Sequence, residues 1–417
     1  MNADGKKRLA DDCFALPAGV DWTPVDEALE RLRTRLETVT STEVVPLMQA
    51  AGRILAEPVT AKRSNPPAAN AAVDGYAFAF DSAKAEASLP LVEARSAAGH
   101  PLGAPLAPGH ACRILTGAEV PEGADTVVLQ EDCEVSSDKV RFPRPKKHGA
   151  NVRRAGEDAV AGDAVFSAGQ VLNAADLARG AAVGLSEVSV RTKLRVAVLS
   201  TGDELIAPGA EGPGIFDANR PMLLALGSGM GAEVLDLGIC KDNAQDVRAS
   251  LDRAAQEADA LITTGGASAG DEDYISQLLS DKGQISTWRV AVKPGRPLAL
   301  GTWQGLPVFG LPGNPVAALV CSLIFVRPAL MALAGAGWVE PQAFTVPAAF
   351  QKSKKPGRRE YLRARVRDGQ AEIFHSEGSG LVGGLSWADG LVELPDGAAE
   401  ISPGDPVRYL PFSSFGL

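Results

Sequence analysis

The chain has 417 residues, of which 45% are hydrophobic and 22% are charged, and its formal net charge is −10. A chain of this length is too long for one ordinary hydrophobic core, so about three or four domains are predicted. The composition is that of a globular protein. The acidic balance argues against nucleic-acid or anionic-membrane binding as the main role, because both require a broad basic surface. A small anionic ligand in a locally basic cleft remains compatible with it.

The five cysteines are widely spaced and never form CxxC, and the four histidines lie far apart. These spacings argue against a disulfide framework or a zinc site and favour a reducing compartment. The N-terminal segment has basic residues but lacks the apolar stretch of a secretory signal. No run approaches the roughly 18 apolar residues of a membrane span, so we expect a soluble, cytoplasmic protein.

In chain order, residues 1–20 are polar or small and are expected to form a flexible N-terminus. A helix is then predicted to begin with Thr23 as N-cap and Pro24 at the first helical position, with Asp26 closing a capping box. Apolar residues recur at helical spacing after this point. We therefore predict a helical and extended domain that starts at about residue 21.

The texture changes at about residue 63 to short apolar runs that are separated by glycine and proline. These runs predict a small β-rich domain over residues 63–154. The helical pattern returns at Ala175–Val183, so the β-rich domain is predicted to be inserted into the helical and extended domain, which comprises residues 21–62 and 155–190.

Strand and helix patterns alternate over residues 191–338, which predicts a mainly parallel sheet with helices on both faces. Short strands return over residues 339–417 and predict a small C-terminal β-barrel. The predicted fold class is therefore a multidomain α/β protein. Ligands of such parallel sheets bind at the carboxyl ends of the strands.

Two apolar runs end in Thr-Gly and continue at once into small residues and carboxylates: VAVLSTGDEL at 196–205 and ALITTGGASAGDEDY at 260–274. A Gly-rich turn after a buried strand lets backbone N–H groups face a ligand. A tight strand-to-helix turn explains one such motif, whereas the recurrence favours an oxyanion or phosphate site that also holds a cation. The candidate residues here are Thr201, Gly202, Glu204, Gly265, Gly266 and Ser268.

Two more turns fall at the same predicted edge of the sheet. Asp242 follows a strand and precedes a helix, so an N-cap and a functional role both remain open. The LPGNP turn contains Gly313 and Asn314, and it is either a rigid cap on the following helix or a backbone platform for a ligand.

Basic residues gather in WRVAVKPGRP, where Arg289 and Lys293 are four apart on an extended run, with Arg296 beyond the Pro-Gly turn. Facing acid-bearing loops they would bind phosphate or molybdate-like oxyanions, whereas alone they would be solvated surface. A second basic group is interpreted as a solvated loop: Lys352, Lys354, Lys355, Arg358 and Arg359.

The remaining motifs are weak by themselves. Asp74 precedes glycine in a turn, and Thr116 ends a short strand pattern. The GxGxxG match at 378–383 lacks a surrounding βαβ unit, and no GxxxxGK[ST] occurs. Neither a dinucleotide-binding protein nor a P-loop enzyme is therefore indicated.

Taken in order, these segments resemble the MoeA-type molybdopterin molybdenumtransferase family, which is similar to the gephyrin E-domain. The resemblance covers about Asp21 to the C-terminus and is carried by AVDGYA, RILTGAEVPEGADTVV, GANVRRAGEDAVAGD, STGDEL, TGGASAGDEDY, VKPGRP and LPGNPV. It implies that the 191–338 segment is a molybdopterin-binding domain and that the helical and extended domain dimerises. It also implies a cleft shared between two protomers of a homodimer.

The reaction that the resemblance implies is insertion of molybdate into the dithiolene of adenylylated molybdopterin, with Mg²⁺ required and AMP released. Implied catalytic positions are Asp74, Thr116, Glu204, Asp242 and Asp273, of which Glu204, Asp242 and Asp273 are candidate Mg²⁺ ligands. Implied anion-binding or substrate-binding positions include Asp158, Arg289, Lys293, Arg363 and Ser379. A molybdopterin adenylyltransferase and acceptor molybdoenzymes are the implied protein partners.

The sequence departs from the family at two places. Arg289 stands where relatives often have lysine, which keeps the charge and changes its geometry. Ala267 and Ala269 replace larger residues of the Gly-rich turn.

Two other functions compete with the enzymatic one. A molybdopterin adenylyltransferase or CinA-like protein would share only the α/β domain, and a scaffold would bind partners without catalysis.

Overall fold

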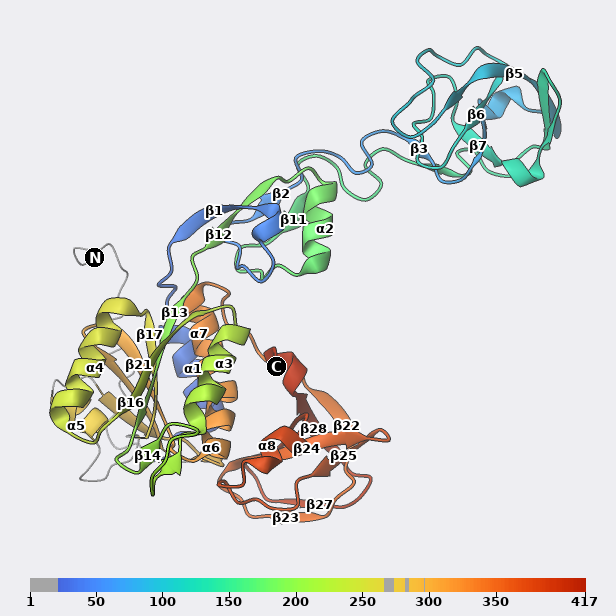
Figure 1. Ribbon diagram of the computed structural model, residues 1–417. Helices are drawn as coiled ribbons and strands as arrows, with labels where there is room; N and C mark the ends of the chain where they lie inside the picture. Colours follow the sequence, from blue (N-terminus) through green and yellow to red (C-terminus); the bar gives the residue numbers. More distant parts are fainter. Residues whose placement is uncertain (1–21, 266–273, 282–284, 296) are drawn as a thin grey trace.

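The structure is a computed structural model that describes residues 22–265, 274–281, 285–295 and 297–417. The predicted flexible segment 1–20 lies outside these ranges. Figure 1 shows an elongated molecule, in which an α/β body and a C-terminal body lie side by side at one end. A middle body connects them to a β-rich body at the far end.

The α/β body is built on a six-stranded sheet of order β16-β13-β17-β21-β20-β18. Its strands are β13 (Arg195–Thr201), β16 (Glu233–Cys240), β17 (Ala260–Thr264), β18 (Ile285–Arg289), β20 (Pro297–Trp303) and β21 (Leu306–Leu311). The pairs β16–β13, β13–β17 and β17–β21 are parallel, as predicted, whereas β20 pairs antiparallel with both neighbours.

Strand β20 was not predicted, and a tight hairpin explains its presence. Gln304 and Gly305 connect β20 to β21, and both have positive φ angles of 52° and 76°. Two central residues of this kind match the twist of an antiparallel hairpin. The sheet therefore changes from parallel to antiparallel at β21, within a segment that we read as alternating strand and helix.

Helices cover both faces of this sheet (Figure 1). One face carries α3 (Asn219–Gly229) and a continuous helical run of α6 (Pro315–Cys321), the π-helical η4 (Ser322–Val326) and α7 (Arg327–Ala334). The other face carries α4 (Ala244–Glu257) and α5 (Tyr274–Asp281). A short pair, β14 (Leu205–Ile206) with β15 (Ile215–Phe216), follows β13 at the edge of the body.

The run Pro315–Ala334 is long and apolar enough to cross a membrane by length and composition, although we expected no such run. Within the structure 94% of its most apolar window is buried, because the run packs against the sheet as a core helix. The buried core helix of a protein can be as long and as apolar as a membrane span, so the fold explains this segment.

Helix α1 (Val25–Arg35) differs from the prediction in its cap and in its place. Pro24 occupies the N-cap position without a side-chain cap, so the predicted Thr23–Asp26 capping box is wrong. Thr23 is instead buried and forms a parallel bridge with Val290. The helix packs in the core of the α/β body, beside α7, although its residues lie in the segment assigned to the helical and extended domain.

The middle body has a small core of its own between two-stranded ribbons and one helix. Its elements are β1 (Thr42–Pro46), η1 (Leu47–Gln49), β2 (Val59–Thr60), β11 (Ala164–Phe166), α2 (Ala174–Ala182) and β12 (Glu187–Arg191). Asn173 caps α2 in a capping box with Asp176. Two long segments of the chain leave this body and lead to the β-rich body (Figure 1).

The β-rich body holds a six-stranded sheet of order β7-β4-β6-β5-β9-β8. Its elements are β3 (Asn70–Ala71), β4 (Gly75–Phe78), η2 (Phe80–Ser82), β5 (Glu86–Ser96), β6 (Ala111–Ile114), β7 (Thr126–Leu129), η3 (Gln130–Asp132), β8 (Glu134–Val135), β9 (Lys139–Pro143) and β10 (Val152–Arg153).

The C-terminal body is mostly antiparallel, and β19 (Val292–Lys293) of the preceding segment joins its sheet through β24. Its other elements are β22 (Phe344–Pro347), β23 (Lys352–Lys354), β24 (Arg359–Arg367), β25 (Gln370–Ile373), α8 (Gly383–Trp387), β26 (Gly390–Leu394), β27 (Ala399–Ile401), β28 (Pro406–Pro411) and η5 (Phe412–Phe415). This pairing fixes the C-terminal body to the α/β body.

Candidate functional site

The carboxyl ends of β13, β17 and β21 meet at one point. Gly265 has φ +80°, and a Cβ there would lie 2.5 Å from the Thr201 carbonyl oxygen. Nδ2 of Asn219 donates to the Gly313 carbonyl oxygen at 2.7 Å and to Thr264 Oγ1 at 3.2 Å. The three predicted turns are therefore packed together, and Asn219 links two of them.

Asn219 escaped the sequence prediction because its position at the start of α3 resembles an ordinary helix start. The sequence signal that existed was a polar residue within a mostly apolar helix. The structure shows that this residue is buried, with 5% of its surface exposed. Buried amides require hydrogen-bond partners, so such a residue points to a structural link between neighbouring turns.

The acidic residues of the first turn lie beside these strand ends. A Cβ at Gly202 would lie 2.7 Å from Glu204 Oε2, so the carboxylate folds back over the glycine. Asp203 Oδ1 accepts the backbone N–H of Asp242 at 3.2 Å. The loops that carry Glu204 and Asp242 are thus joined at the ends of β13 and β16.

The N-cap interpretation of Asp242 is wrong, because Asn243 caps α4 and accepts the Asp246 N–H at 2.9 Å. Gly266, Ser268 and Asp273 lie outside the described residues. Among the residues that are described, no three His, Cys, Asp or Glu side chains form a group that would hold a metal ion.

We predicted that Arg289 and Lys293 lie on one extended run, and the structure shows that this prediction is wrong. Strand β18 ends at Arg289 in the α/β sheet, and β19 with Lys293 belongs to the sheet of the C-terminal body. The Arg289 side chain and the whole of Arg296 lie outside what the structure describes. Lys293 Nζ donates to Glu377 Oε2 at 2.6 Å and to Glu360 Oε1 at 3.4 Å.

Arg363 organises the loop that carries Ser379. Its guanidinium donates to the carbonyl oxygens of Leu381 (2.7 Å), Ser376 (2.5 Å) and Gly378 (3.0 Å). It also lies 4.7 Å from the ring centroid of Phe374, and burial lowers the pKa of Arg363. Because two of its nitrogens are engaged by backbone carbonyls, Arg363 shapes this loop directly.

The same loop contacts the start of α6. The Val316 N–H donates to the Ser379 carbonyl oxygen at 3.3 Å. In the amide orientation that satisfies both groups, the Asn314 oxygen accepts from Ser379 Oγ at 2.9 Å. Asn314, Ser379, Arg363 and Lys293 are therefore brought together from the α/β and C-terminal bodies.

Asp74 and Thr116 form a pair within the β-rich body. Asp74 Oδ1 accepts from Thr116 Oγ1 at 2.6 Å and from its backbone N–H at 2.7 Å. These two bonds, the side-chain bond first, lower the pKa of Asp74. Asp158 is a partner of Asn65, whose Nδ2 donates to it at 2.9 Å.

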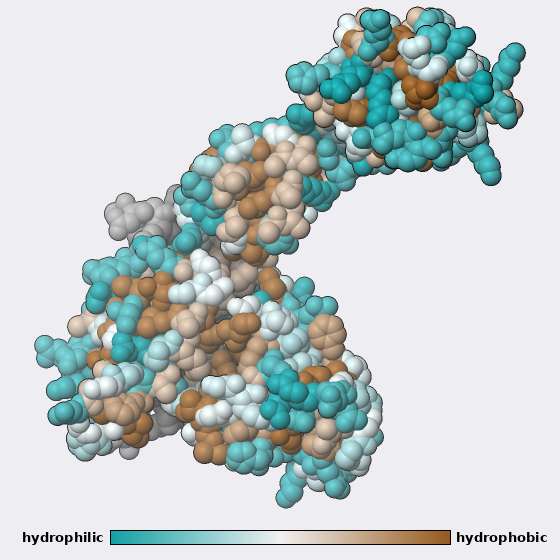
Figure 2. Space-filling view, turned by 45° about the vertical axis from the view of Figure 1, so that its right-hand side comes forward, coloured by the Kyte–Doolittle hydropathy of each residue, from teal (hydrophilic) through white to brown (hydrophobic). Residues whose placement is uncertain are grey.

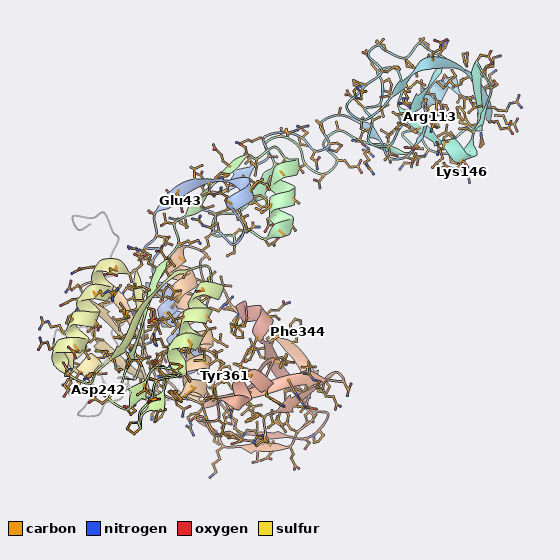
Figure 3. The ribbon with its side chains drawn as sticks, viewed as in Figure 1. Glu43, Arg113, Lys146, Asp242, Phe344 and Tyr361 are labelled. Atoms are coloured by element: carbon orange, nitrogen blue, oxygen red, sulfur yellow. The ribbon has the colours of Figure 1, made fainter. Side chains whose placement is uncertain are left out.

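The structure does not bring Asp74 and Thr116 to the strand ends within one chain. Arg113 of β6, in the same body as Asp74, and Asp242 lie at opposite ends of the molecule (Figure 3). The middle body separates the two regions (Figure 1).

The basic group at 352–359 is not a uniformly solvated loop, which corrects our interpretation. Lys354 is 4% exposed, and the side chains of Lys352 and Arg359 are 9% and 14% exposed. Lys352 bonds to Glu377 and lies 3.3 Å from Glu360, whereas Arg359 bonds to Asp26 at 2.6 Å. Strand alternation in β23 and β24 turns these cations inward.

Three family models match consecutive parts of the chain. They describe the MoeA N-terminal region (domain I and II) at residues 23–184, a probable molybdopterin binding domain at 197–332, and the MoeA C-terminal region (domain IV) at 345–412. The matched ranges together include every residue discussed above as part of a candidate site.

Relatives match over nearly the whole chain. A molybdopterin molybdenumtransferase of Haemophilus influenzae is 34% identical over 398 residues, which is 93% of this chain and 98% of that protein. One of Nostoc is 38% identical over 399 residues, or 90% of each. The crystal structure of a MoeA protein from Pyrococcus horikoshii OT3 matches with a TM-score of 0.81 at 28% identity, covering 94% of this chain and all of that one. The chain belongs to the MoeA family of molybdopterin molybdenumtransferases.

Proposed function

We propose that the protein acts in molybdenum cofactor biosynthesis as a molybdopterin molybdenumtransferase, inserting molybdate into the dithiolene of adenylylated molybdopterin with Mg²⁺-dependent release of AMP. The observation that carries this proposal is the meeting of three Gly-containing strand ends with Lys293 of β19 and with the loop that contains Ser379. Backbone N–H groups and a cation at such a point suit phosphate and molybdate oxygens. The family membership over nearly the whole chain supports it.

The strand-end turns are proposed to bind the pterin and phosphates through Thr201, Gly202, Gly265, Gly266, Ser268, Gly313 and Asn314. Arg289, Lys293, Arg296 and Ser379 are proposed to hold anionic oxygens, and Asp158 is proposed to line the substrate site. Arg363 is proposed to position the Ser379 loop, because its guanidinium binds three carbonyl oxygens of that loop.

Mg²⁺ is proposed to bind through Glu204 and Asp242, with Asp273 as a third candidate. Protein-bound Mg²⁺ uses one or two carboxylates together with substrate phosphates, so a complete cage of acidic residues is not required. The joined loops at the ends of β13 and β16 fit this requirement. When bound, the ion would neutralise phosphate charge during cleavage of the phosphoanhydride.

A homodimer is proposed to complete the site, with Asp74 and Thr116 of one protomer facing Glu204 of the other. Figure 2 shows apolar surface on the middle body. Its exposed large hydrophobic side chains include Val44, Met48 and Val171, which are 63%, 87% and 41% exposed. Exposed apolar groups of this kind mark association surfaces.

The proposed domains are 21–62 with 155–190, 63–154, 191–338 and 339–417, with α1 counted in the α/β core. A cytoplasmic location is proposed, with a molybdopterin adenylyltransferase and acceptor molybdoenzymes as partners. The alternative of an adenylyltransferase or CinA-like protein is not favoured, because family models also match outside the α/β domain.

The direct test supplies adenylylated molybdopterin, molybdate and Mg²⁺ to the purified protein and measures AMP and the molybdenum cofactor. Product formation that depends on all three components is expected. Absence of AMP release from the folded protein would refute the proposed enzymatic activity. A scaffold would bind molybdopterin without forming AMP.

The shared cleft has its own test. Asp74→Ala and Glu204→Ala should each abolish activity, whereas the exposed controls Asp81→Ala and Glu211→Ala should not. Mixing the two inactive variants under conditions of subunit exchange creates mixed dimers with one intact site, so roughly a quarter of the activity should return. No recovery, with exchange verified, would exclude a site that combines Asp74 and Glu204 from different chains.

A further inference from the structure

The basic half of the candidate site contains a network of two lysines and two glutamates. Lys293 on β19, Lys352 on β23 and Glu360 on β24 come from strands, and Glu377 comes from the loop after β25. Lys293 and Glu360 are direct register partners in the β19–β24 pair. The formal charges of the four side chains cancel at neutral pH.

Glu377 is the member that binds both cations most closely. Its Oε2 lies 2.6 Å from Lys293 Nζ, whereas Glu360 Oε1 lies 3.4 Å from the same nitrogen. Its Oε1 forms the shortest contact of Lys352, which lies 3.3 Å from Glu360. The Glu377 carboxylate therefore occupies the place where an incoming oxyanion would meet Lys293.

The two glutamates differ in their freedom to move. The Glu360 side chain is 9% exposed and belongs to a central strand, whereas the Glu377 side chain is 44% exposed. Arg363 holds the carbonyl oxygens of Ser376 and Gly378 on either side of Glu377. Rotation of the Glu377 side chain into solvent thus leaves the loop backbone in place.

We propose that Glu377 is an internal counter-anion that occupies the oxyanion position beside Lys293 and Lys352, and that it leaves this position when a tetrahedral oxyanion binds. This inference rests on the proposed role of Lys293 in anion binding. The ligand chemistry is a dianion with tetrahedral oxygens, which either molybdate or a phosphate group supplies. Glu377 acts here as a positioning and selectivity residue.

Charge and space both require the displacement. Adding a dianion to the neutral network would leave two uncompensated negative charges in a partly buried position, whereas departure of Glu377 leaves one. The cavity bounded by Lys293, Arg363, Ser376 and Glu377 has a volume of about 30 Å³. A cavity of this size holds about one or two water molecules, so an oxyanion needs the space that the carboxylate occupies.

Glu377 competes as an anion at neutral pH. Hydrogen bonds from Lys293 and Lys352 lower the pKa of Glu377, which keeps it ionised. Burial opposes the charge on Lys352, but Glu377 and Glu360 raise the pKa of Lys352 overall. Weakly binding anions at low concentration therefore do not displace the Glu377 carboxylate. A multivalent oxyanion competes more effectively for the ammonium groups of Lys293 and Lys352.

The test measures binding of molybdate alone and of inorganic phosphate alone by calorimetry at pH 7.5. Glu377→Gln should tighten binding of at least one of the two anions about three- to tenfold, a range set by the partial exposure of the carboxylate. The anion that gains more identifies whether molybdate or phosphate uses the position. The matched control is Glu372→Gln, because Glu372 is 39% exposed, belongs to the same body and pairs with Arg365 instead.

Thermal unfolding of both variants checks that the fold is intact, and Glu377→Asp, which keeps the charge, should bind anions no tighter than the natural protein. Unchanged affinity in Glu377→Gln, or equal tightening in Glu372→Gln, would overturn the proposal. So would the absence of binding by every variant. Activity separates the two proposals. An active natural protein with unchanged Glu377→Gln affinity rejects only the counter-anion, whereas tightened binding without AMP release rejects only the proposed reaction.

Discussion

The turn at Gly265 provides the sharpest test of how the strand ends are packed. In Gly265→Ala the new Cβ would lie 2.5 Å from the Thr201 carbonyl oxygen and 2.8 Å from Thr201 Oγ1, at a φ angle of +80°. A left-handed conformation costs a non-glycine residue about 1–2 kcal/mol. The overlap adds about 1–3 kcal/mol, because the neighbouring atom belongs to the backbone of a buried strand.

Gly209→Ala is the matched control. Gly209 lies in the same body with φ +83°, and nothing lies within 4 Å of the position of its Cβ. This variant should therefore lose only the conformational contribution of about 1–2 kcal/mol. The difference between the two variants isolates the contact between Gly265 and Thr201.

The assay is hydrogen exchange by mass spectrometry on peptides that cover the central strand β13, because their slowest exchange reports the free energy of unfolding of the α/β body. Gly265→Ala should lower this free energy by about 1–3 kcal/mol more than Gly209→Ala does. Equal losses would refute the close packing of the strand ends. On the proposed function, Gly265→Ala should also lose AMP release while Gly209→Ala keeps it.

Three further outcomes are expected. Asn173→Ala removes the capping box with Asp176 and should lower the unfolding free energy of the middle body by about 1 kcal/mol, measured by hydrogen exchange of α2. Phe325→Ala empties a fully buried position in the core helix and should cost about 3–5 kcal/mol, which a fall in the thermal midpoint would report. Thr116→Val should raise the pKa of Asp74 back towards 3.8 in an NMR titration, because both lowering bonds come from Thr116 and the variant keeps only the backbone one. The contribution of this pair to stability is complete above pH 3.8 and is lost as the pH falls through the lowered pKa, and a Thr116→Val protein with the same acid dependence would contradict it.

Most of the α/β fold could be predicted because its strands are continuous apolar runs and its helices have helical periodicity. Strand β17 coincides with the apolar run that ends in the second Thr-Gly motif, and helix α4 follows Asp242 as predicted. The departures have structural causes that hydrophobic periodicity does not report. A hairpin turn creates β20, and the bridge between Thr23 and Val290 replaces the capping box that local sequence favours at α1.

The candidate site was predictable where glycine and acids recur after strands, because that pattern reports backbone geometry. The sequence prediction failed where the site depends on contacts between segments that are distant in the sequence. Lys352 looked like part of a solvated basic run, since nothing in its neighbourhood shows that Glu377 and Glu360 face it. Asn219 was likewise hidden, because its partners Thr264 and Gly313 lie far away in the sequence.

The arrangement of the bodies divides the candidate site into two parts with different requirements. The strand ends, Lys293 and the Ser379 loop are assembled within one chain, because β19 joins the C-terminal sheet and Val316 bonds to Ser379. Asp74 and Thr116 lie in a body that extends away from them. In the proposed dimer, oxyanion binding needs only a folded protomer, whereas AMP release needs two protomers. Oxyanion affinity should therefore be independent of protein concentration, while specific activity should fall once dilution separates the protomers.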